Sequence, residues 1–401
     1  MKNINVIIIG AGAAGMMCAW QALRRGRSVM IIDHMRKIGE KIRISGGGKC
    51  NFTNLHCRPN NFISQNPHFC KSALKRFTPR DFIQMLRDHD IEYHQKRFDD
   101  NADESSKGQM FCNKSALDIV EMLQFNIENA SGKFQLGTKV KNIKKDGTEF
   151  IVATDKGDFS CESLVIASGG LSIPKIGASN FGYELAKQFG LNIIAPRAGL
   201  VPLTFDEELL SQTKELSGLS LNASISCVGQ TFREGLLFTH RGLSGPSILQ
   251  ISSYWREDKE ISVNLAPDIN VFEELKAARK NQPKQMLRSV LSGIVPSRIA
   301  AMIAGFSNND TRIADLSDKK LRYVSDLVSS WKIKPKGSEG YRTAEVTLGG
   351  VDTNEISSKT LEAKNVAGLY FVGEVLDVTG HLGGHNLQWA WSSGHCAGQV
   401  A

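Results

Sequence analysis

Two short apolar runs with almost no polar interruption lie near the start of the chain, at residues 4–9 (INVIII) and 28–33 (SVMIID). Strands buried on both faces of a parallel sheet have this pattern, whereas strands with one solvated face alternate apolar and polar positions. Between these runs, residues 16–26 (MMCAWQALRRG) have helix-forming composition and end on glycine, where helices commonly stop. The pattern predicts a strand–helix–strand unit, which is how a doubly wound α/β sheet begins.

Further helices and strands are predicted along the rest of the chain. Apolar spacing predicts helical structure over 68–89, with a break at Thr78-Pro79, and an amphipathic helix over 114–130. Residues 134–170 predict a strand, a hairpin and a return strand that ends in two glycines. A further buried strand is expected at 369–376, followed by a last helix, whereas residues 36–60 are expected to form an extended loop.

The pattern changes in the middle of the chain. Short strand-like runs between polar turns occupy about 195–268, and helical patterns occupy about 269–343. We therefore expect a discontinuous nucleotide-binding domain formed by 1–194 and 344–401. The intervening residues 195–343 would form an inserted substrate domain, consisting of a small β-barrel and then a helical part.

A glycine motif supports nucleotide binding. Gly10, Gly12 and Gly15 form G-x-G-x-x-G directly between the first strand and the first helix. These glycines permit a tight turn, the approach of a pyrophosphate and close helix–strand packing, and the helix N-terminus favours an anion. Asp33 ends the second strand, where a carboxylate accepts hydrogen bonds from ribose hydroxyls.

Later motifs favour FAD over a nicotinamide dinucleotide. Glycine-rich motifs occur toward both ends of the chain. They are the basic stretch GEKIRISGGGKCNFTN (39–54), the strand and turn LVIASGG (164–170) and a Gly-Gly turn before the last helix. This distribution suits a long cofactor that crosses a sheet. The last helix begins near Asn386, and its N-terminus is suited to the flavin N1/O2 edge, where negative charge grows on reduction.

Composition and charge limit the classes of protein that remain. The chain has 401 residues, a net charge of +8 and eight cysteines without a CxxC pair, so zinc-ribbon and disulfide-scaffold proteins have no support. Residues 36–97 hold 13 Lys/Arg and 5 Asp/Glu, and residues 271–345 hold 14 and 8, which permits a polyanionic partner such as nucleic acid. The uncharged run at 3–23 is interrupted by glycines and amides and lacks a signal-peptide cleavage site. We expect a cytoplasmic protein that is neither membrane-bound nor a metalloprotein.

The motifs together resemble those of a known family. Six segments are similar to the BaiN/RdsA family of flavoproteins, also called HI0933-like. They are IIIGAGAAG (7–15), residues 39–54, VIASGGLSIPKIGASNFGYELAKQFG (165–190), LLFTHRGLSGPSILQIS (236–252), TLGGV (347–351) and GLYFVGEVLDVTGHLGGHNLQWAWSSG (368–394). The chain departs from the family at Lys49, where Arg is common, and at His385, where Tyr is common. Lysine keeps the charge but loses the bidentate fork of arginine.

The resemblance implies an FAD domain split by an insert and reduction of a carbon–carbon double bond with NAD(P)H. One branch of the family is linked to dihydrouridine in ribosomal RNA and the other to steroid-like bile-acid intermediates; this chain is more similar to the ribosomal branch. The residues expected to bind FAD are Gly10, Gly12, Ala13, Ala14, Gly15, Asp33, Lys41, Arg43, Gly46, Gly47, Gly48, Lys49, Cys50, Asn51, Val140, Ala167, Ser168, Gly169, Gly170, Gly373, Glu374, Asp377, Gly383, Gly384, Asn386 and Leu387.

Reduction of a uracil double bond needs a hydride at one carbon and a proton at its neighbour. Cys50, His240 and His385 are the candidate proton donors, and the glycine-rich loop with Lys49 is expected to lower the pKa of Cys50. Each of the three also has a purely structural interpretation. NAD(P)H would visit transiently, because the sequence holds no second G-x-G-x-x-G.

Two other functions stay open from the sequence. One is a small-molecule reductase acting on a steroid-like enone, and the other is an FAD-containing RNA-binding factor without turnover. Lys276, Arg279, Lys280, Lys284, Arg288 and Arg298 are candidate RNA-phosphate contacts, although a solvated helix face has the same composition.

Overall fold

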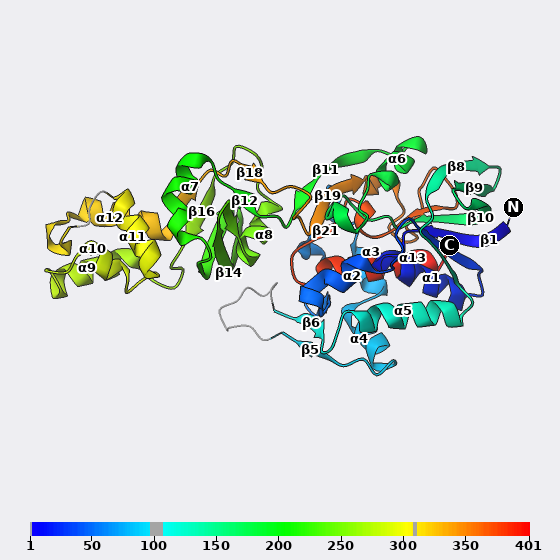
Figure 1. The fold of residues 1–401 in the computed structure, drawn as a ribbon, viewed down its shortest axis with the longest axis horizontal. Helices are drawn as coiled ribbons and strands as arrows, with labels where there is room; N and C mark the ends of the chain where they lie inside the picture. The colour runs from blue at the N-terminus through cyan, green and yellow to red at the C-terminus, as the bar shows by residue number, and fades with distance from the viewer. Residues whose placement is uncertain (1, 97–106, 308–310) are drawn as a thin grey trace. The chain divides into compact units, whose positions relative to one another are not determined.

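The structure, a computed structural model, describes residues 2–96, 107–307 and 311–401. The chain forms two compact units, one of Met1–Ala198 with Ala344–Ala401 and the other of Gly199–Thr343 (Figure 1). Each unit has its own buried apolar core. The first unit is therefore built from both ends of the chain.

A seven-stranded sheet forms the centre of the first unit. Its order is β7-β2-β1-β10-β9-β8, with β20 also paired to β10. The strands are β1 (Lys2–Ile9), β2 (Val29–Asp33), β7 (Lys133–Leu136), β8 (Val140–Asp146), β9 (Glu149–Thr154), β10 (Gly157–Ile166) and β20 (Leu369–Phe371). Pairing is parallel from β7 through β20, whereas β9 and β8 form an antiparallel meander. The predicted parallel sheet of a Rossmann-like fold is confirmed.

The register of this sheet brings three glycine turns to one edge. Ile9 pairs with Ile166, and Ile166 pairs with Phe371, so the last residues of β1, β10 and β20 form one row. Because the three strands are parallel, the turns that follow them begin at the same level. Ligands of open parallel sheets bind outside these carboxyl ends.

Helix α1 (Ala13–Arg24) packs against β1 and β2, and both α5 (Leu117–Asn129) and α13 (His385–Gly398) pack against α1. Helix α13 packs closely on α1. A Cβ atom at Gly394 would lie 2.3 Å from the Ala14 carbonyl oxygen, and one at Gly398 would lie 2.5 Å from that of Cys18. Glycine at both positions therefore lets the C-terminal helix approach the backbone of the first helix.

Residues 36–60 differ from the expected extended loop. They contain α2 (Glu40–Ile44), a 3-10 turn (Ser45–Gly48) and β3 (Asn51–Asn54). Strand β3 pairs with β6 (Gln109–Cys112), which lies much later in the chain. A pairing over that distance leaves no local periodicity, so the strand was not evident from the sequence. The predicted strand at 369–376 is also shorter, because a 3-10 turn begins at Gly373.

Smaller elements complete the first unit. They are β4 (Phe62–Ile63), α3 (Lys71–Arg76), α4 (Pro79–Arg87), β5 (Tyr93–Gln95), α6 (Phe181–Gln188), β11 (Ile193–Gly199), β19 (Val346–Val351) and β21 (Thr379–Gly380). The predicted break at Thr78-Pro79 is confirmed, because α3 ends at Arg76 and α4 begins at Pro79 with Thr78 as its cap. Three small sheets join β3-β6-β5, β11-β19 and β21-β4.

The second unit combines a sheet with a group of helices. Its seven strands pair in the order β17-β16-β13-β14-β15-β12-β18. They are β12 (Leu203–Thr204), β13 (Ser220–Cys227), β14 (Gln230–Thr239), β15 (Gly242–Ser244), β16 (Ile261–Asn264), β17 (Trp331–Ile333) and β18 (Gly337–Ser338). Within the described residues β17 and β18 are not paired with each other, so the expected barrel is an open sheet. The short link between these two strands contains Pro335, which has no N–H to donate.

The helices of this unit are α7 (Glu207–Thr213), α8 (Pro246–Ser252), α9 (Val271–Asn281), α10 (Leu287–Leu291), α11 (Ser297–Phe306) and α12 (Asp318–Ser329). Leu275, Ile299 and Leu321 are fully buried and place one face of each long helix in the core. The helical pattern read over 269–343 is thus present. In the parts of the chain that the structure describes, no helix has the length and apolar character needed to cross a membrane.

Candidate functional site

The G-x-G-x-x-G turn has the geometry of an anion-binding loop. Gly10 has φ of 116°, and a Cβ there would lie 2.3 Å from the Ala167 carbonyl oxygen. A Cβ at Gly15 would lie 2.0 Å from the Gly10 carbonyl oxygen, so this glycine lets α1 approach β1. At Gly12, by contrast, a Cβ would meet no protein atom within 4 Å. Gly12 is the N-cap of α1 and has no side chain to accept a hydrogen bond, so the N–H groups of the first turn, at Ala13 and Ala14, have no partner within the helix.

Asp33 holds this loop against the second strand. Its Oδ2 accepts a hydrogen bond from the Ala11 N–H at 2.7 Å, and its Oδ1 accepts one from the Met35 N–H at 2.8 Å. Its backbone carbonyl accepts the Thr138 N–H at 2.9 Å, just before Val140 begins β8. Each carboxylate oxygen keeps a second lone pair for another donor. The sequence indicated the acid, but the role of Asp33 in pinning the glycine loop came only with the structure.

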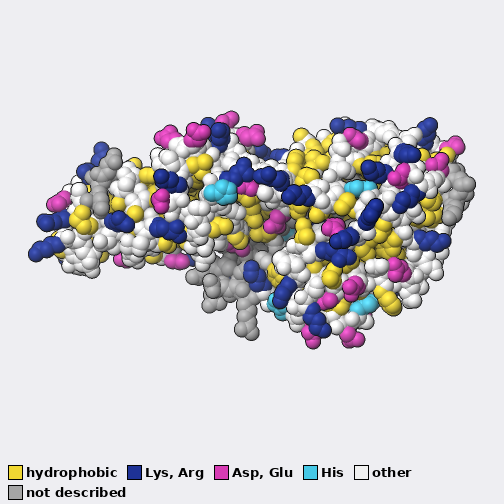
Figure 2. All heavy atoms as spheres, in the orientation of Figure 1, with side chains coloured by type: hydrophobic (Ala, Val, Ile, Leu, Met, Phe, Trp, Pro, Cys, Tyr) yellow, Lys and Arg dark blue, Asp and Glu magenta, His cyan; other side chains and the backbone are white. Residues whose placement is uncertain are grey.

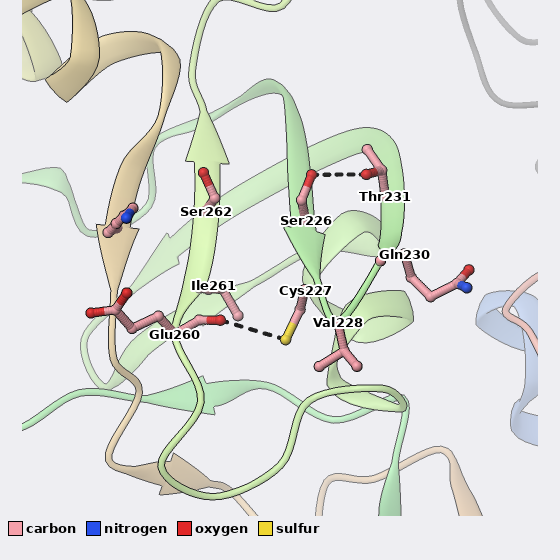
Figure 3. Close-up of a pocket in the computed structure, with 10 residues that line it drawn as sticks. Ser226, Cys227, Val228, Gln230, Thr231, Glu260, Ile261 and Ser262 are labelled. Atoms are coloured by element: carbon pink, nitrogen blue, oxygen red, sulfur yellow. Dashed lines mark hydrogen bonds between the residues drawn. The ribbon is translucent and has the colours of Figure 1, made fainter.

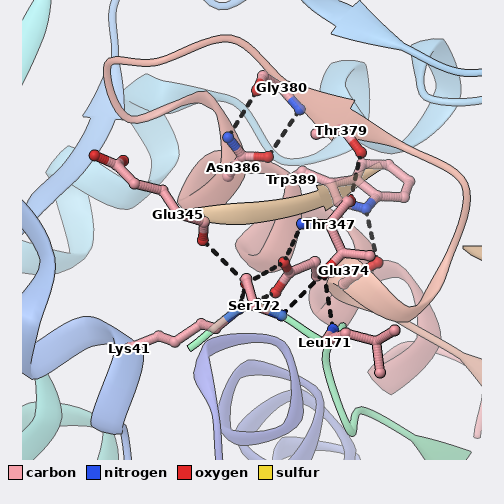
Figure 4. Close-up of polar contacts among 11 residues, drawn as sticks. Lys41, Leu171, Ser172, Glu345, Thr347, Glu374, Thr379, Gly380, Asn386 and Trp389 are labelled. Atoms are coloured by element: carbon pink, nitrogen blue, oxygen red, sulfur yellow. Dashed lines mark hydrogen bonds and ion pairs between the residues drawn. The ribbon is translucent and has the colours of Figure 1, made fainter. Parts of the chain in front are cut away.

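A polar cluster joins four distant segments beside the glycine turns (Figure 4). The Lys41 Nζ lies 2.5 Å from Glu374 Oε2 and donates to Ser172 Oγ at 2.7 Å. Glu374 Oε1 accepts from the Thr347 N–H at 2.9 Å and from Ser172 Oγ at 3.1 Å. Thr347 Oγ1 in turn accepts the N–H groups of residues 171 and 172, at 2.8 and 3.1 Å. We name Lys41, Ser172, Thr347 and Glu374 the lysine–glutamate cluster.

The sequence predicted two members of this cluster and missed the other two. Lys41 and Glu374 were both expected at the cofactor, whereas Ser172 and Thr347 were not singled out. Ser172 and Thr347 are fully buried polar residues within glycine-rich motifs, and that placement was the available signal. Ile173, next to Ser172, has φ of 58°. A β-branched residue rarely adopts such a backbone, which here turns Ser172 into the cluster.

The loop after α2 is held open by glycines. Gly46, Gly47 and Gly48 all have positive φ, and a Cβ at Gly47 would meet nothing within 4 Å. Lys49 is exposed, whereas the Arg43 Nε donates to the Ile38 carbonyl at 2.9 Å and so supports the loop itself. The Asn51 side-chain amide lies against Gln109, with their polar atoms 3.0 Å apart. This loop therefore presents backbone and one lysine to solvent.

Cys50 does not have the environment that the sequence suggested. It is fully buried, and burial raises the pKa of its thiol well above the usual value, with only a partial offset from a hydrogen bond with Ser45. The expected lowering of the pKa is wrong, because Lys49 points to solvent while the thiol is enclosed by protein. The positive φ of 49° places Cys50 at the bend into β3.

The turn before α13 is also fixed by close contacts. Gly383 and Gly384 have φ of 111° and 92°, and a Cβ at Gly384 would lie 2.5 Å from the Thr53 carbonyl oxygen. The Asn386 side chain accepts the Gly380 N–H and donates to the Gly380 carbonyl, both at 2.8 Å. Asn386 thus closes the turn, and Leu387 follows it half-buried.

His385 lies inside this turn rather than on its surface. It is fully buried, and its ring packs edge-on against Phe62 and His381, with centroid separations of 6.1 and 6.4 Å. Burial lowers the pKa of His381 to about 4, so that neighbour is neutral near pH 7. The pair forms part of the packing beneath the start of α13.

Six other predicted residues lie at or near the ends of these strands. Asp377 is buried and accepts the Gln65 N–H at 2.8 Å, and burial raises the pKa of its carboxyl. Ala167 donates its N–H to the Ile9 carbonyl at 2.8 Å, continuing the β1–β10 ladder. The turn then passes through Ser168, Gly169 and Gly170, and Gly170 lies against Thr347. Gly373, on the next strand end, accepts the Trp389 indole N–H at 3.0 Å.

Ser168 Oγ, just after β10, and Glu40 Oε1, at the first residue of α2, are buried and have no hydrogen-bond partner among the described residues. Unpartnered buried polar atoms are costly in a folded protein, so each marks a position where a ligand group is expected. Over the same described residues, no group of three or more His, Cys, Asp or Glu side chains is placed to hold a metal ion.

His240 belongs to the second unit. It is exposed in the turn between β14 and β15, where Thr239 Oγ1 accepts the N–H groups of residues 241 and 242. The Arg241 Nη1 lies 3.6 Å from Glu339 Oε1. This unit also holds a recess of about 330 Å³ at the β13–β14 hairpin, lined by Cys227, Glu260 and Lys332 among others (Figure 3). None of the predicted site residues lines that recess.

Comparisons with known proteins agree with this arrangement. The family model described as "HI0933-like protein Rossmann domain" matches residues 4–400. The chain is 48% identical over 401 residues to a ribosomal RNA dihydrouridine synthase of Escherichia coli, covering 100% of this chain and 98% of that protein. It is 26% identical to a 3-dehydro-bile acid delta(4,6)-reductase of Clostridium scindens, with 98% of each chain covered.

A solved structure of a flavocytochrome c3 fumarate reductase in an open conformation has a similar fold. Its TM-score is 0.51 at 14% identity, and the match covers 99% of this chain and 78% of that chain. At this identity the likeness concerns the fold alone.

Proposed function

This chain belongs to the HI0933-like family, and we propose that it is an FAD-dependent oxidoreductase that reduces uridine to dihydrouridine in ribosomal RNA. The observation that carries the proposal is the 48% identity, over the whole length of both chains, to a protein named for that activity. The bile-acid reductase is more distant, at 26% identity. A ribosomal RNA substrate would place the reaction in the cytoplasm.

The first unit fits FAD on its own geometry. The open space at Gly12 and the uncapped N-terminus of α1 suit a pyrophosphate, and Asp33 has free lone pairs for ribose hydroxyls. The unpartnered oxygens of Ser168 and Glu40 are suited to further hydroxyl groups of such a cofactor. The N-terminus of α13, after Gly384, would favour the flavin edge on which negative charge grows. When bound, FAD would supply the hydride for the reduction, after reduction by NAD(P)H.

The other residues expected at FAD would either approach the cofactor directly or hold the loops around it. Backbone groups of Gly46–Gly48, of Gly169 and of Gly383 would approach the cofactor, because side chains are absent there. Lys49 would supply positive charge from the exposed loop. Arg43, Asn51, Asp377 and Asn386 would act by fixing loops, since their side chains already bind the protein.

The two compact units support a division of labour. We propose that 1–194 with 344–401 hold FAD and that 195–343 select the substrate, a boundary close to the change between the units. In the second unit, exposed Lys280, Lys284 and Arg288 are available for RNA phosphates. Lys276, Arg279 and Arg298 instead bind Glu273, Asp318 and the Glu215 carbonyl. Figure 2 shows basic side chains over this helical part.

The buried candidates are not suited to deliver a proton to RNA. Cys50 and His385 are each covered by protein, so we propose that they shape the site. His240 is exposed on the second unit, so we propose that it contacts the substrate.

Two measurements test the function. Deletion of the gene should remove dihydrouridine from ribosomal RNA, and the purified yellow protein should restore it on a protein-free RNA fragment with NAD(P)H. Turnover of a steroid-like enone alone would contradict the RNA substrate. If NAD(P)H failed to bleach the flavin while RNA still bound, the protein would be a binding factor without turnover.

A further inference from the structure

Glu345 differs from Asp33, Glu374 and Asp377, three other carboxylates around the glycine turns. Asp33, Glu374 and Asp377 each accept hydrogen bonds from protein N–H, N–H₃⁺ or O–H groups. Over the part of the chain that the structure describes, the Glu345 carboxylate forms neither a hydrogen bond nor an ion pair. Its side chain is exposed, whereas its neighbours Ala344 and Val346 are 0% and 6% exposed.

The backbone of Glu345 is fixed by the lysine–glutamate cluster. Its carbonyl oxygen lies 3.1 Å from Ser172 Oγ, whose single proton is shared between this carbonyl and Glu374 Oε1, and the next residue but one is Thr347. Strand β19 then continues as a fully buried strand. In Figure 4 the Glu345 carboxylate points away from Ser172 and Glu374. The backbone of Glu345 is therefore fixed, while its carboxyl is unengaged and open to solvent, as it must be in an acid that takes its proton from solvent.

We propose that Glu345 is the general acid of the reduction, and this rests on the proposed function. The reduction adds a hydride to one carbon of the uracil C5=C6 bond and a proton to its neighbour. The carboxyl O–H bond breaks, and the electron pair of the π bond forms the new C–H bond. Glu345 is left as a carboxylate and regains a proton from solvent, to which it is exposed. The two electrons come from NAD(P)H.

The electrostatics of the residue agree with this role. Although the side chain is exposed, the surrounding protein partly desolvates the carboxyl and raises its pKa. The elements packed against β19 carry Arg197 on β11, Glu374 next to β20, and Glu184 and Lys187 on α6. Lys41 of α2 reaches Glu374, and Arg342 lies shortly before Glu345 in the chain. Lys41 is paired with Glu374. A raised pKa keeps a larger fraction of the acid protonated near neutral pH.

The test compares Glu345→Gln with wild type on a ribosomal RNA fragment. Glutamine keeps the size and removes the proton, so the rate of RNA reduction should fall by at least about 100-fold, the usual contribution of general acid catalysis. Flavin content, melting temperature and the rate of flavin bleaching by NAD(P)H should not change. Glu345→Asp should recover part of the rate. Glu121→Gln, an exposed glutamate of α5, is the matched control and should behave as wild type.

A pH profile separates chemistry from structure. In wild type the RNA step should slow as pH rises through the pKa of Glu345, because the acid must be protonated, and Glu345→Gln should lack this limb. An RNA rate for Glu345→Gln equal to that of Glu121→Gln would overturn the proposal. Loss of the step in His240→Asn but not in Glu345→Gln would also overturn it. If wild type reduces no uridine under conditions where NAD(P)H bleaches its flavin, the RNA function itself fails.

Discussion

The Lys41 ammonium lies 2.5 Å from a carboxylate oxygen of Glu374, although 333 positions separate the two residues. The pair ties the glycine-rich segment near the N-terminus to the strand end near the C-terminus. The two side chains are largely covered, with 33% and 18% exposure. Water therefore screens the pair only partly. Its position makes it a link between the two halves of a discontinuous domain.

Removal of both partners should therefore cost less than the two single removals added together. Glu374→Ala leaves the Lys41 charge and the Thr347 N–H without their partner, and should lower the free energy of unfolding by about 1–3 kcal/mol. The double variant Lys41→Met/Glu374→Ala should be less destabilised than the sum of the two single variants. Urea unfolding of the four proteins measures this coupling, and strict additivity would contradict the interaction.

Gly12→Val should remove flavin without unfolding the protein. A Cβ at this position meets no protein atom within 4 Å, so the added side chain would project into the space that the pyrophosphate needs. The flavin-to-protein absorbance ratio of the purified variant measures retention. Gly305→Ala is the matched control, because its Cβ also meets no atom within 4 Å, but it lies in α11 of the second unit. Full flavin occupancy in Gly12→Val would show that this loop does not bind the phosphates.

Gly394→Val should destabilise the first unit through helix packing. The new Cβ would lie 2.3 Å from the Ala14 carbonyl oxygen, so α13 would have to move away from α1. Overpacking of this kind costs about 1–3 kcal/mol, and backbone contact favours the upper end of that range. Thermal unfolding of the apo-protein measures the effect. A melting temperature equal to that of Gly305→Ala would contradict the close contact.

Stability should fall in mild acid because His381 is buried as the neutral form. Burial lowers its pKa to about 4 from an ordinary 6.5, so between these pH values the unfolded chain binds a proton that the folded protein does not. The free energy of unfolding should then decrease as pH falls, by up to about 1.4 kcal/mol per pH unit from this one group. His381→Leu should flatten that slope between pH 6.5 and 4. Urea unfolding across this range is the measurement, and an unchanged slope would contradict the assignment.

Removal of basic side chains from the helical part of the second unit should make RNA binding less dependent on salt concentration. Lys280→Gln, Lys284→Gln and Arg288→Gln remove three exposed charges that form no ion pair with the other described residues. If all three contact phosphates, the log–log salt slope should flatten by about 2, since each contact on single-stranded RNA contributes about 0.7. The control removes Lys133, Lys144 and Lys187, exposed lysines of the first unit. Equal slopes for the two triple variants would exclude this surface.

Local sequence patterns were sufficient for much of the fold. The uninterrupted apolar runs of β1 and β2, and the glycines between β1 and α1, define a parallel strand–helix–strand unit because burial and φ preferences act within a few residues. The change of pattern near 195 and 343 likewise indicated an insert. Strand β3 was missed because its partner β6 is far away in sequence, and the closed barrel was not found because strand pairing at sheet edges depends on distant segments.

By itself, the sequence determined the Rossmann-like unit, its glycine loop between β1 and α1, and the presence of Asp33, Lys41 and Glu374 in motifs of one family. Only the tertiary structure decided what these side chains contact. It joined Lys41 to Glu374 through Ser172 and Thr347, enclosed Cys50 and His385, and left the Glu345 carboxyl unengaged. The physical reason is that burial and hydrogen bonding are set by segments far apart in the chain, whereas a motif records only residue types and their spacing.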